Sequence, residues 1–139
     1  MIDKKTSLLL LLRADDEKPI FGKTRFMKLM YIADKELAKK GISVNLYNFC
    51  KHYYGPYSDE LTTDLESLVR EKLVSCDIRI SGVFKENIYT LTKTGEQLLP
   101  KDLDSNVVKI FETVKRRYGD MSLSSLIREV YTNYPISQL

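Results

Sequence analysis

Apolar residues within residues 23–40 recur at positions i, i+3, i+4, i+7 and i+11, and this spacing predicts a helix with one buried face. The stripe consists of Phe26, Leu29, Met30, Ala33 and Leu37. Lysines at the end of the segment suit the negative pole of a helix, and the glycine that follows suits a helix cap. We therefore expect one helix over the whole segment, with its apolar stripe in the core.

Four further segments show helical spacing. The first, residues 4–13, has leucines on every side, which indicates deep burial or a shared interface. The others are residues 58–72, a segment from Leu103 to Tyr118, and a segment that begins at Ser122 and ends before Pro135. The last two have long apolar faces that must be buried against this chain or against a partner, so we also consider a homodimer.

Residues 74–81 alternate between apolar and polar side chains, which is the period of a strand with one apolar face. The apolar positions are Val74, Cys76, Ile78 and Ile80. A returning strand at residues 88–91 completes a hairpin with its tip near residues 82–86. Thr92 then suits the N-cap of a short helix.

The stretch "HYYGPYSDEL", residues 52–61, joins an extended aromatic segment, residues 44–54, to the helix at residues 58–72. Gly55 permits unusual backbone angles and Pro56 fixes φ, so the pair is interpreted as a hinge from strand to helix. Ser58 is a good N-cap, and acidic residues follow it in the first turn, where they meet the positive end of the helix dipole.

The order helix, helix, extended segment, helix, strand, turn, strand is that of a winged helix-turn-helix domain. Residues 65–99 resemble the core of many such domains, in which an "LT..G" segment, here Leu91, Thr92 and Gly95, opens the helix after the wing. We therefore expect an α+β, mostly α fold with a β-hairpin wing and additional C-terminal helices. Residues 1–100 would form the winged-helix core, and residues 101–139 a helical extension packed on the core or at a dimer interface.

A second resemblance covers residues 28–56, which are similar to the Panacea-type antitoxin domain and to the related YwgA-like proteins. Lys28, Leu29 and Tyr31 match the "KL.Y" helix of those families, and residues 54–56 match their aromatic-Gly-Pro turn. Tyr57 stands where those families usually have valine. The resemblance implies a protein that acts by binding without catalysis, and in Panacea-type systems the partner would be a toxin or a protease.

Composition gives a mildly basic, globular chain of 139 residues with a formal net charge of +3. The charges are unevenly distributed: residues 21–52 carry seven basic side chains and two acidic ones, whereas residues 57–80 carry three basic and six acidic ones. The surface is therefore expected to be polarised. The N-terminal leucine run is shorter than a signal peptide's apolar region or the about 20 residues of a membrane span, so we expect a cytoplasmic protein.

Candidate catalytic and metal-binding chemistry is sparse. The sequence contains no phosphate-binding glycine loop, nucleophile elbow or HExxH motif, so His52 and Asp59 are not expected to act as an acid–base pair. Cys50 and Cys76, with one histidine in the chain, are too few for a zinc site and suit free thiols in a reducing compartment. We expect no enzyme activity, no cofactor and no metal.

Two kinds of partner remain, DNA and protein. The helix before the wing normally reads DNA, but here its polar positions are mainly acidic and would be repelled by phosphates. Contacts to DNA would instead come from four basic residues: Lys23, Arg25, Lys28 and, on the wing, Lys85. A dimer that brings residues 115–117, "KRR", to the duplex is a further possibility.

The protein-binding hypothesis uses aromatic and apolar residues, which suit interface hot spots better than phosphate contacts. These residues are Tyr53, Tyr54, Tyr57, Val83 and Phe84. Each of them would lose this role if it packs into the core of its own chain. The sequence therefore predicts non-enzymatic regulatory binding, with DNA-linked regulation placed slightly ahead of an antitoxin-like or adaptor role.

Overall fold

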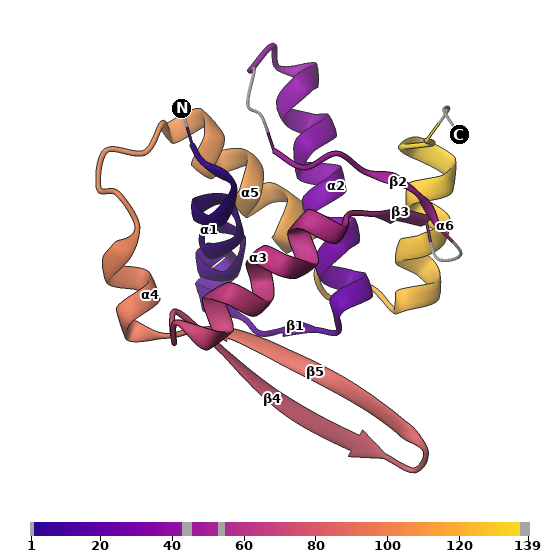
Figure 1. The fold of residues 1–139 in the computed structure, drawn as a ribbon. Helices are drawn as coiled ribbons and strands as arrows, with labels where there is room; N and C mark the ends of the chain where they lie inside the picture. Colours follow the sequence, from indigo (N-terminus) through magenta and orange to yellow (C-terminus); the bar gives the residue numbers. More distant parts are fainter. Residues whose placement is uncertain (1, 43–45, 53–54, 137–139) are drawn as a thin grey trace.

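The computed structural model describes residues 2–42, 46–52 and 55–136. The described chain is a mostly helical α+β fold with a small hairpin and C-terminal helices (Figure 1). The helices are α1 (Lys4–Glu17), α2 (Lys23–Lys39), α3 (Asp59–Arg70), α4 (Lys93–Leu98), α5 (Ser105–Tyr118) and α6 (Leu123–Asn133). The strands are β1 (Ile20–Phe21), β2 (Cys50–His52), β3 (Gly55–Tyr57), β4 (Val74–Ser81) and β5 (Phe84–Leu91).

Helix starts follow the capping residues that the sequence supplies. The Ser58 hydroxyl accepts a hydrogen bond from the Leu61 N–H at 3.2 Å, and the Thr92 hydroxyl accepts one from the Gly95 N–H at 3.0 Å. Both N-cap predictions are thus confirmed. In α1 the helical backbone stops before Ala14, and Asp15 has a φ of 52°, which agrees with the predicted end at residue 13.

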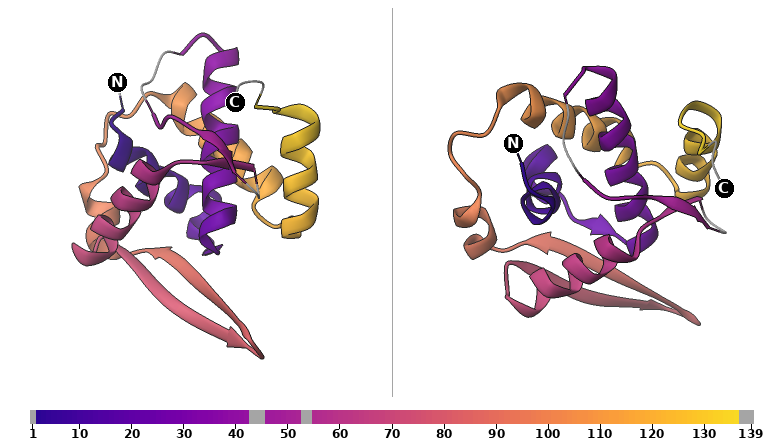
Figure 2. Two further views of the ribbon diagram at one scale, coloured as in Figure 1. Left: turned by 45° about the vertical axis from the view of Figure 1, so that its right-hand side comes forward. Right: turned by 45° about the horizontal axis from the view of Figure 1, so that its top comes forward.

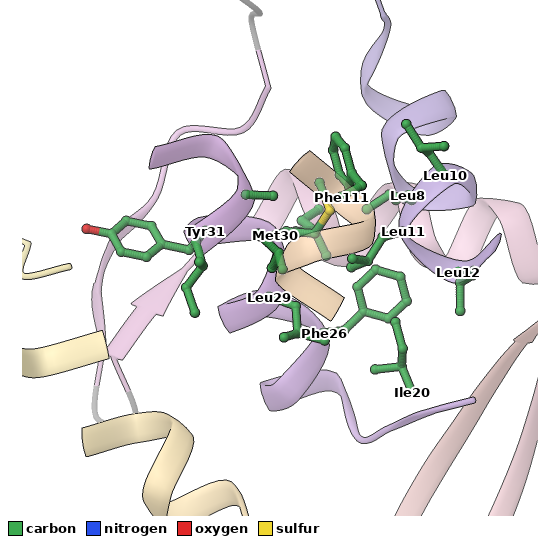
Figure 3. Packing of buried hydrophobic residues seen from close by; sticks show 14 of the residues in the cluster. Leu8, Leu10, Leu11, Leu12, Ile20, Phe26, Leu29, Met30, Tyr31 and Phe111 are labelled. Atoms are coloured by element: carbon green, nitrogen blue, oxygen red, sulfur yellow. The ribbon is translucent and has the colours of Figure 1, made fainter. Parts of the chain in front are cut away.

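The core forms around α2, whose predicted stripe is buried throughout. Leucines of α1 and Phe111 of α5 pack against it (Figure 3). Because α5 packs on both α1 and α2, its apolar face is covered within this chain and the C-terminal extension shares one core with the N-terminal part. α6 lies against α2 and β3. The homodimer stays a prediction.

The interpretation of Gly55 and Pro56 as a hinge is wrong. Both residues lie in β3, which pairs antiparallel with β2 so that Cys50 faces Tyr57 and His52 faces Gly55. The chain changes from strand to helix after Tyr57, because Ser58 already caps α3. Gly55 does adopt the positive φ that the sequence suggested, at 102°. The predicted extended segment was too long, since residues 46–49 form no strand and residues 43–45 lie outside the described chain.

The second sheet has the order β1-β5-β4, with all neighbours antiparallel. Its base belongs to the core, where the rings of Tyr89 and Phe26 meet edge to face with centroids 5.7 Å apart. Beyond that base β4 and β5 project from the body as a two-stranded arm (Figures 1 and 2). β5 begins at Phe84, four residues before the predicted start, and Gly82, with a φ of 62°, and Val83 form the turn.

Candidate functional site

The most prominent surface feature is the arm formed by the outer parts of β4 and β5, residues 77–88. Among the described residues, seven large apolar side chains are exposed, and four of them lie on this arm. They are Ile78, Ile80, Val83 and Phe84, with exposed fractions of 55%, 72%, 95% and 75%. An exposed apolar cluster of this kind is typical of an interaction surface.

The strand register places these side chains around the arm. Ile78 faces Asn87 and Ile80 faces Lys85 across the hairpin, whereas Phe84 faces Ser81. Since side chains alternate along a strand, Ile78 and Ile80 lie on one face and Phe84 lies on the opposite face. The tip is therefore apolar on both sides, and β4 is an outer strand of its sheet with an edge open for pairing.

The charged residues of the arm offset one another. Its two basic residues, Arg79 and Lys85, are matched by Asp77 and Glu86. Arg79 forms an ion pair with Glu86, and its guanidinium lies 5.0 Å from the centroid of the Phe21 ring. If the arm contacts DNA, the contact between its tip and the duplex would rest on Lys85, which is exposed.

Two of the four residues predicted to bind DNA are not free at the surface, since Arg25 is hydrogen-bonded within the protein and Lys28 is buried. Arg25 donates hydrogen bonds to the carbonyls of Gly119, at 3.3 Å, and Met121. It also donates from Nε to the Phe21 carbonyl at 3.2 Å, and burial lowers the pKa of Arg25. This side chain therefore ties the start of α2 to the connection between α5 and α6.

Lys28 is buried, with an exposed fraction of 1%, and burial lowers its pKa to about 8. Lys23 is partly exposed at the start of α2. Within residues 115–117, Lys115 is buried and donates to the Leu12 carbonyl at 2.8 Å, whereas Arg116 and Arg117 are exposed. Fewer of the basic residues predicted to contact DNA therefore lie at the surface than the sequence suggested.

The exposed face of α3 is acidic, as predicted. Asp59, Glu60 and Glu66 are exposed on it, and Glu71 follows at its end. Two of these carboxylates pair with lysines of α1: Lys4 lies 2.7 Å from Glu60 and Lys5 lies 3.5 Å from Glu71. The pairs are at the surface, so they only partly offset the negative charge that α3 would present to a duplex.

The aromatic part of the predicted site lies at the β2–β3 hairpin. Tyr57 is half-buried and stacks on the imidazole of His52, with ring centroids 4.9 Å apart. Tyr53 and Tyr54 lie outside the described residues. Cys50 is exposed and Cys76 half-buried, both as free thiols, and no group of three metal-ligating side chains occurs in the described chain.

Sequence reasoning missed two features of the surface. It placed Ile78 and Ile80 on one face of β4 but had no signal that this face extends beyond the core. It also treated Lys28 and Gly55 separately, although a Cβ built on Gly55 would lie 3.2 Å from the Lys28 Nζ.

Comparison with known proteins gives one relative and no family. No protein-family model matches the chain. Over 90 residues the chain is 34% identical to "Uncharacterized protein YwgA" of Bacillus subtilis (strain 168). The match covers 64% of this chain and 51% of the relative, so the chain spans about half the length of that protein. The resemblance to YwgA is thus confirmed over part of the chain.

No helix in the described ranges is long and apolar enough to cross a membrane.

Proposed function

We propose that the chain is a winged helix-turn-helix protein that regulates a protein partner by binding it, without catalysis, through the β4–β5 arm. Two observations support the winged-helix assignment. The elements follow the order α1, β1, α2, α3, β4, β5, with the β2–β3 hairpin inserted between α2 and α3, and β1 pairs with β5 beside the arm. The arm then takes the place of the wing. The YwgA-like and Panacea-like motif supports a binding role, with a toxin- or protease-like protein as the partner.

The observation that carries this proposal is the apolar tip of the arm. Val83 is almost fully exposed and Phe84 is three-quarters exposed, and burying such a side chain against a partner is worth about 1.5–3 kcal/mol. The arm has no net charge, so it lacks the positive potential that phosphate binding needs. An open β4 edge adds main-chain hydrogen-bonding groups with which an extended segment of a partner can pair.

DNA-linked regulation is the competing function, and the winged-helix order together with the partly exposed Lys23 and the exposed Lys85 favours it. The burial of Lys28, the internal hydrogen bonds of Arg25 and the acidic face of α3 weigh against it. These placements lead us to put the protein partner first, the reverse of the order suggested by the sequence.

The test places a photo-crosslinking amino acid at Phe84, with the exposed Lys101 as matched control, in cells that express the protein. We expect a discrete heteromeric adduct from position 84 that is absent from position 101. In parallel, anisotropy of a labelled duplex is measured from about 50 to 200 mM salt. No adduct at position 84, together with salt-sensitive duplex binding that Lys85→Ala weakens, would contradict the proposal and favour the DNA-linked function.

A further inference from the structure

A small pocket of about 150 Å³ lies between the first two turns of α2 and the β2–β3 hairpin. α2 contributes Lys23, Thr24 and Lys28 to its lining, and the hairpin contributes His52, Gly55 and Tyr57. None of the arm's residues lines this pocket. It combines three basic side chains and a threonine hydroxyl with the apolar Met27 and Pro56, and no carboxylate is among its lining residues in the described chain.

The ammonium group of Lys28 ends at this pocket. The side chain is 1% exposed, and it forms no hydrogen bond or ion pair with another described residue. An ammonium that is almost enclosed and has no partner among the described residues is costly, because it has lost most of its water without gaining a hydrogen bond or an ion pair. A lysine with a purely structural role would end on a carbonyl or a carboxylate.

Gly55 makes room for this ammonium. A Cβ at position 55 would lie 3.2 Å from Lys28 Nζ and 3.3 Å from its Cε, closer than ordinary contact. The φ of 102° at the same residue also disfavours any side chain. The backbone of β3 thus approaches the lysine closely and leaves its Nζ at the pocket instead of covering it with a side chain.

The start of α2 adds to the positive potential. Its N-cap, Gly22, has no side chain to accept a hydrogen bond from the first N–H groups. These groups lie at the positive end of a helix of 17 residues, which favours anions. Lys23 and Thr24, both in this first turn, line the pocket.

We propose that this pocket binds a single oxyanion group, a phosphate or a carboxylate, with the Lys28 ammonium as its buried counter-charge. The Thr24 hydroxyl and Lys23 complete the donors at the rim. With a volume of about 150 Å³, the pocket has room for one such headgroup. The site is separate from the arm, so its test does not depend on the proposed partner.

The experiment is an amide ¹H–¹⁵N NMR titration of the full chain at pH 6.5, where Lys28 is protonated, with inorganic phosphate and, separately, sodium acetate. Sodium chloride holds the ionic strength constant, which removes non-specific screening effects. We expect saturable shifts that are centred on the amides of Lys23, Thr24 and Gly55. The anion that saturates at the lower concentration identifies phosphate or carboxylate as the preferred group.

Three variants keep the test specific. Lys28→Met should lower the affinity for the preferred anion by at least about tenfold, since a charge-assisted hydrogen bond is lost. Thr24→Val should lower this affinity by a smaller factor. Lys115→Met removes the other buried lysine and should leave the affinity unchanged. The amide spectrum of each variant also shows whether it is folded.

The proposal is overturned if neither anion gives saturable shifts at these amides. It is equally overturned if folded Lys28→Met binds as tightly as the natural chain, or if Lys115→Met weakens binding as much as Lys28→Met does.

Discussion

Lys28 on α2 and Lys115 on α5 are two buried lysines in nearly the same condition. Their exposed fractions are 1% and 2%, and burial lowers the pKa of each to about 8. They differ in what the ammonium meets. Lys115 Nζ donates to the Leu12 carbonyl at 2.8 Å, whereas Lys28 Nζ lies beside Gly55 at a small pocket.

The position of each lysine relative to a helix end explains the difference. Leu12 belongs to the last helical turn of α1, whose carbonyls lack intrahelical partners and carry partial negative charge, so the cation of Lys115 completes that end. Lys28 lies in the second turn of α2, near the positive end, where the dipole disfavours a cation. Burial disfavours both charges, but a hydrogen bond to a helix end partly offsets this cost for Lys115, whereas Lys28 has no acceptor among the described residues.

Replacing Gly55 has the largest expected effect on this comparison. Gly55→Ala should destabilise the fold by about 2–3 kcal/mol, because the residue has a positive φ and its Cβ would crowd Lys28. Urea unfolding measures the change in free energy. The matched control is Gly41→Ala, a glycine that also has a positive φ, 72°, but no neighbour within 4 Å of its Cβ.

Gly41→Ala should cost only the backbone part, about 1–2 kcal/mol. If both substitutions cost the same, Gly55 does not make room for the lysine and the close approach has no energetic consequence.

Removing Lys115 should have the next largest effect. Lys115→Met keeps the apolar stem but leaves the Leu12 carbonyl without its donor, so we expect a loss of about 1–2 kcal/mol of unfolding free energy at pH 7. Chemical denaturation monitored by circular dichroism gives the value. A more stable Lys115→Met protein would show that this lysine is no structural partner of α1.

Removing Lys28 should have an effect of the opposite sign. Lys28→Met fills a similar volume and removes a buried charge that has no partner among the described residues, so in anion-free buffer at pH 7 the protein should gain about 1 kcal/mol. The same denaturation experiment measures it. A loss as large as that of Lys115→Met would mean that Lys28 has a structural partner and that the two lysines are equivalent.

The stability gained by Lys28→Met should shrink with rising pH. In the natural protein the pKa of Lys28 is about 8 when folded and near the ordinary 10.5 when unfolded. Above pH 8 the unfolded state therefore binds more protons, and the stability of the natural protein rises until about pH 10.5. A pKa shift from 10.5 to about 8 corresponds to roughly 3 kcal/mol. The gain of about 1 kcal/mol at pH 7 should therefore disappear above pH 8 and change sign before pH 10.

Unfolding free energies of the two proteins at pH 7, 8.5 and 10 measure this difference. Lys23, His52 and Tyr57 also line the pocket, but they occur in both proteins, so they largely cancel in the comparison. A difference that stays constant with pH would contradict the assignment of the cost to the Lys28 charge.

The sequence predicted those parts of the molecule that depend on local pattern. The stripe of α2, the caps at Ser58 and Thr92 and the strand at residues 74–81 follow from spacing and side-chain chemistry. The arm could not be predicted from such a pattern, because the alternation of apolar and polar residues is the same whether the apolar face packs on a core or extends into solvent. For Ile78 and Ile80 only the path of the chain decides between the two.

The pocket depended on a contact between distant residues. Periodicity placed Lys28 next to the apolar stripe of α2, but nothing local showed that β3 would cover it. Gly55 carried a clear signal for an unusual backbone angle, which the structure confirms, yet its pairing with His52 in a second hairpin was not predicted. Residues 28 and 55 come together only in the folded chain.

The most direct measurement is the titration of the two lysine ammonium groups by NMR of their ¹³Cε nuclei, without anion and with saturating phosphate or acetate. The account predicts that the preferred anion raises the pKa of Lys28 above its value of about 8 and leaves the pKa of Lys115 unchanged. A pKa of Lys28 that neither anion moves, or equal shifts at both lysines, would contradict it.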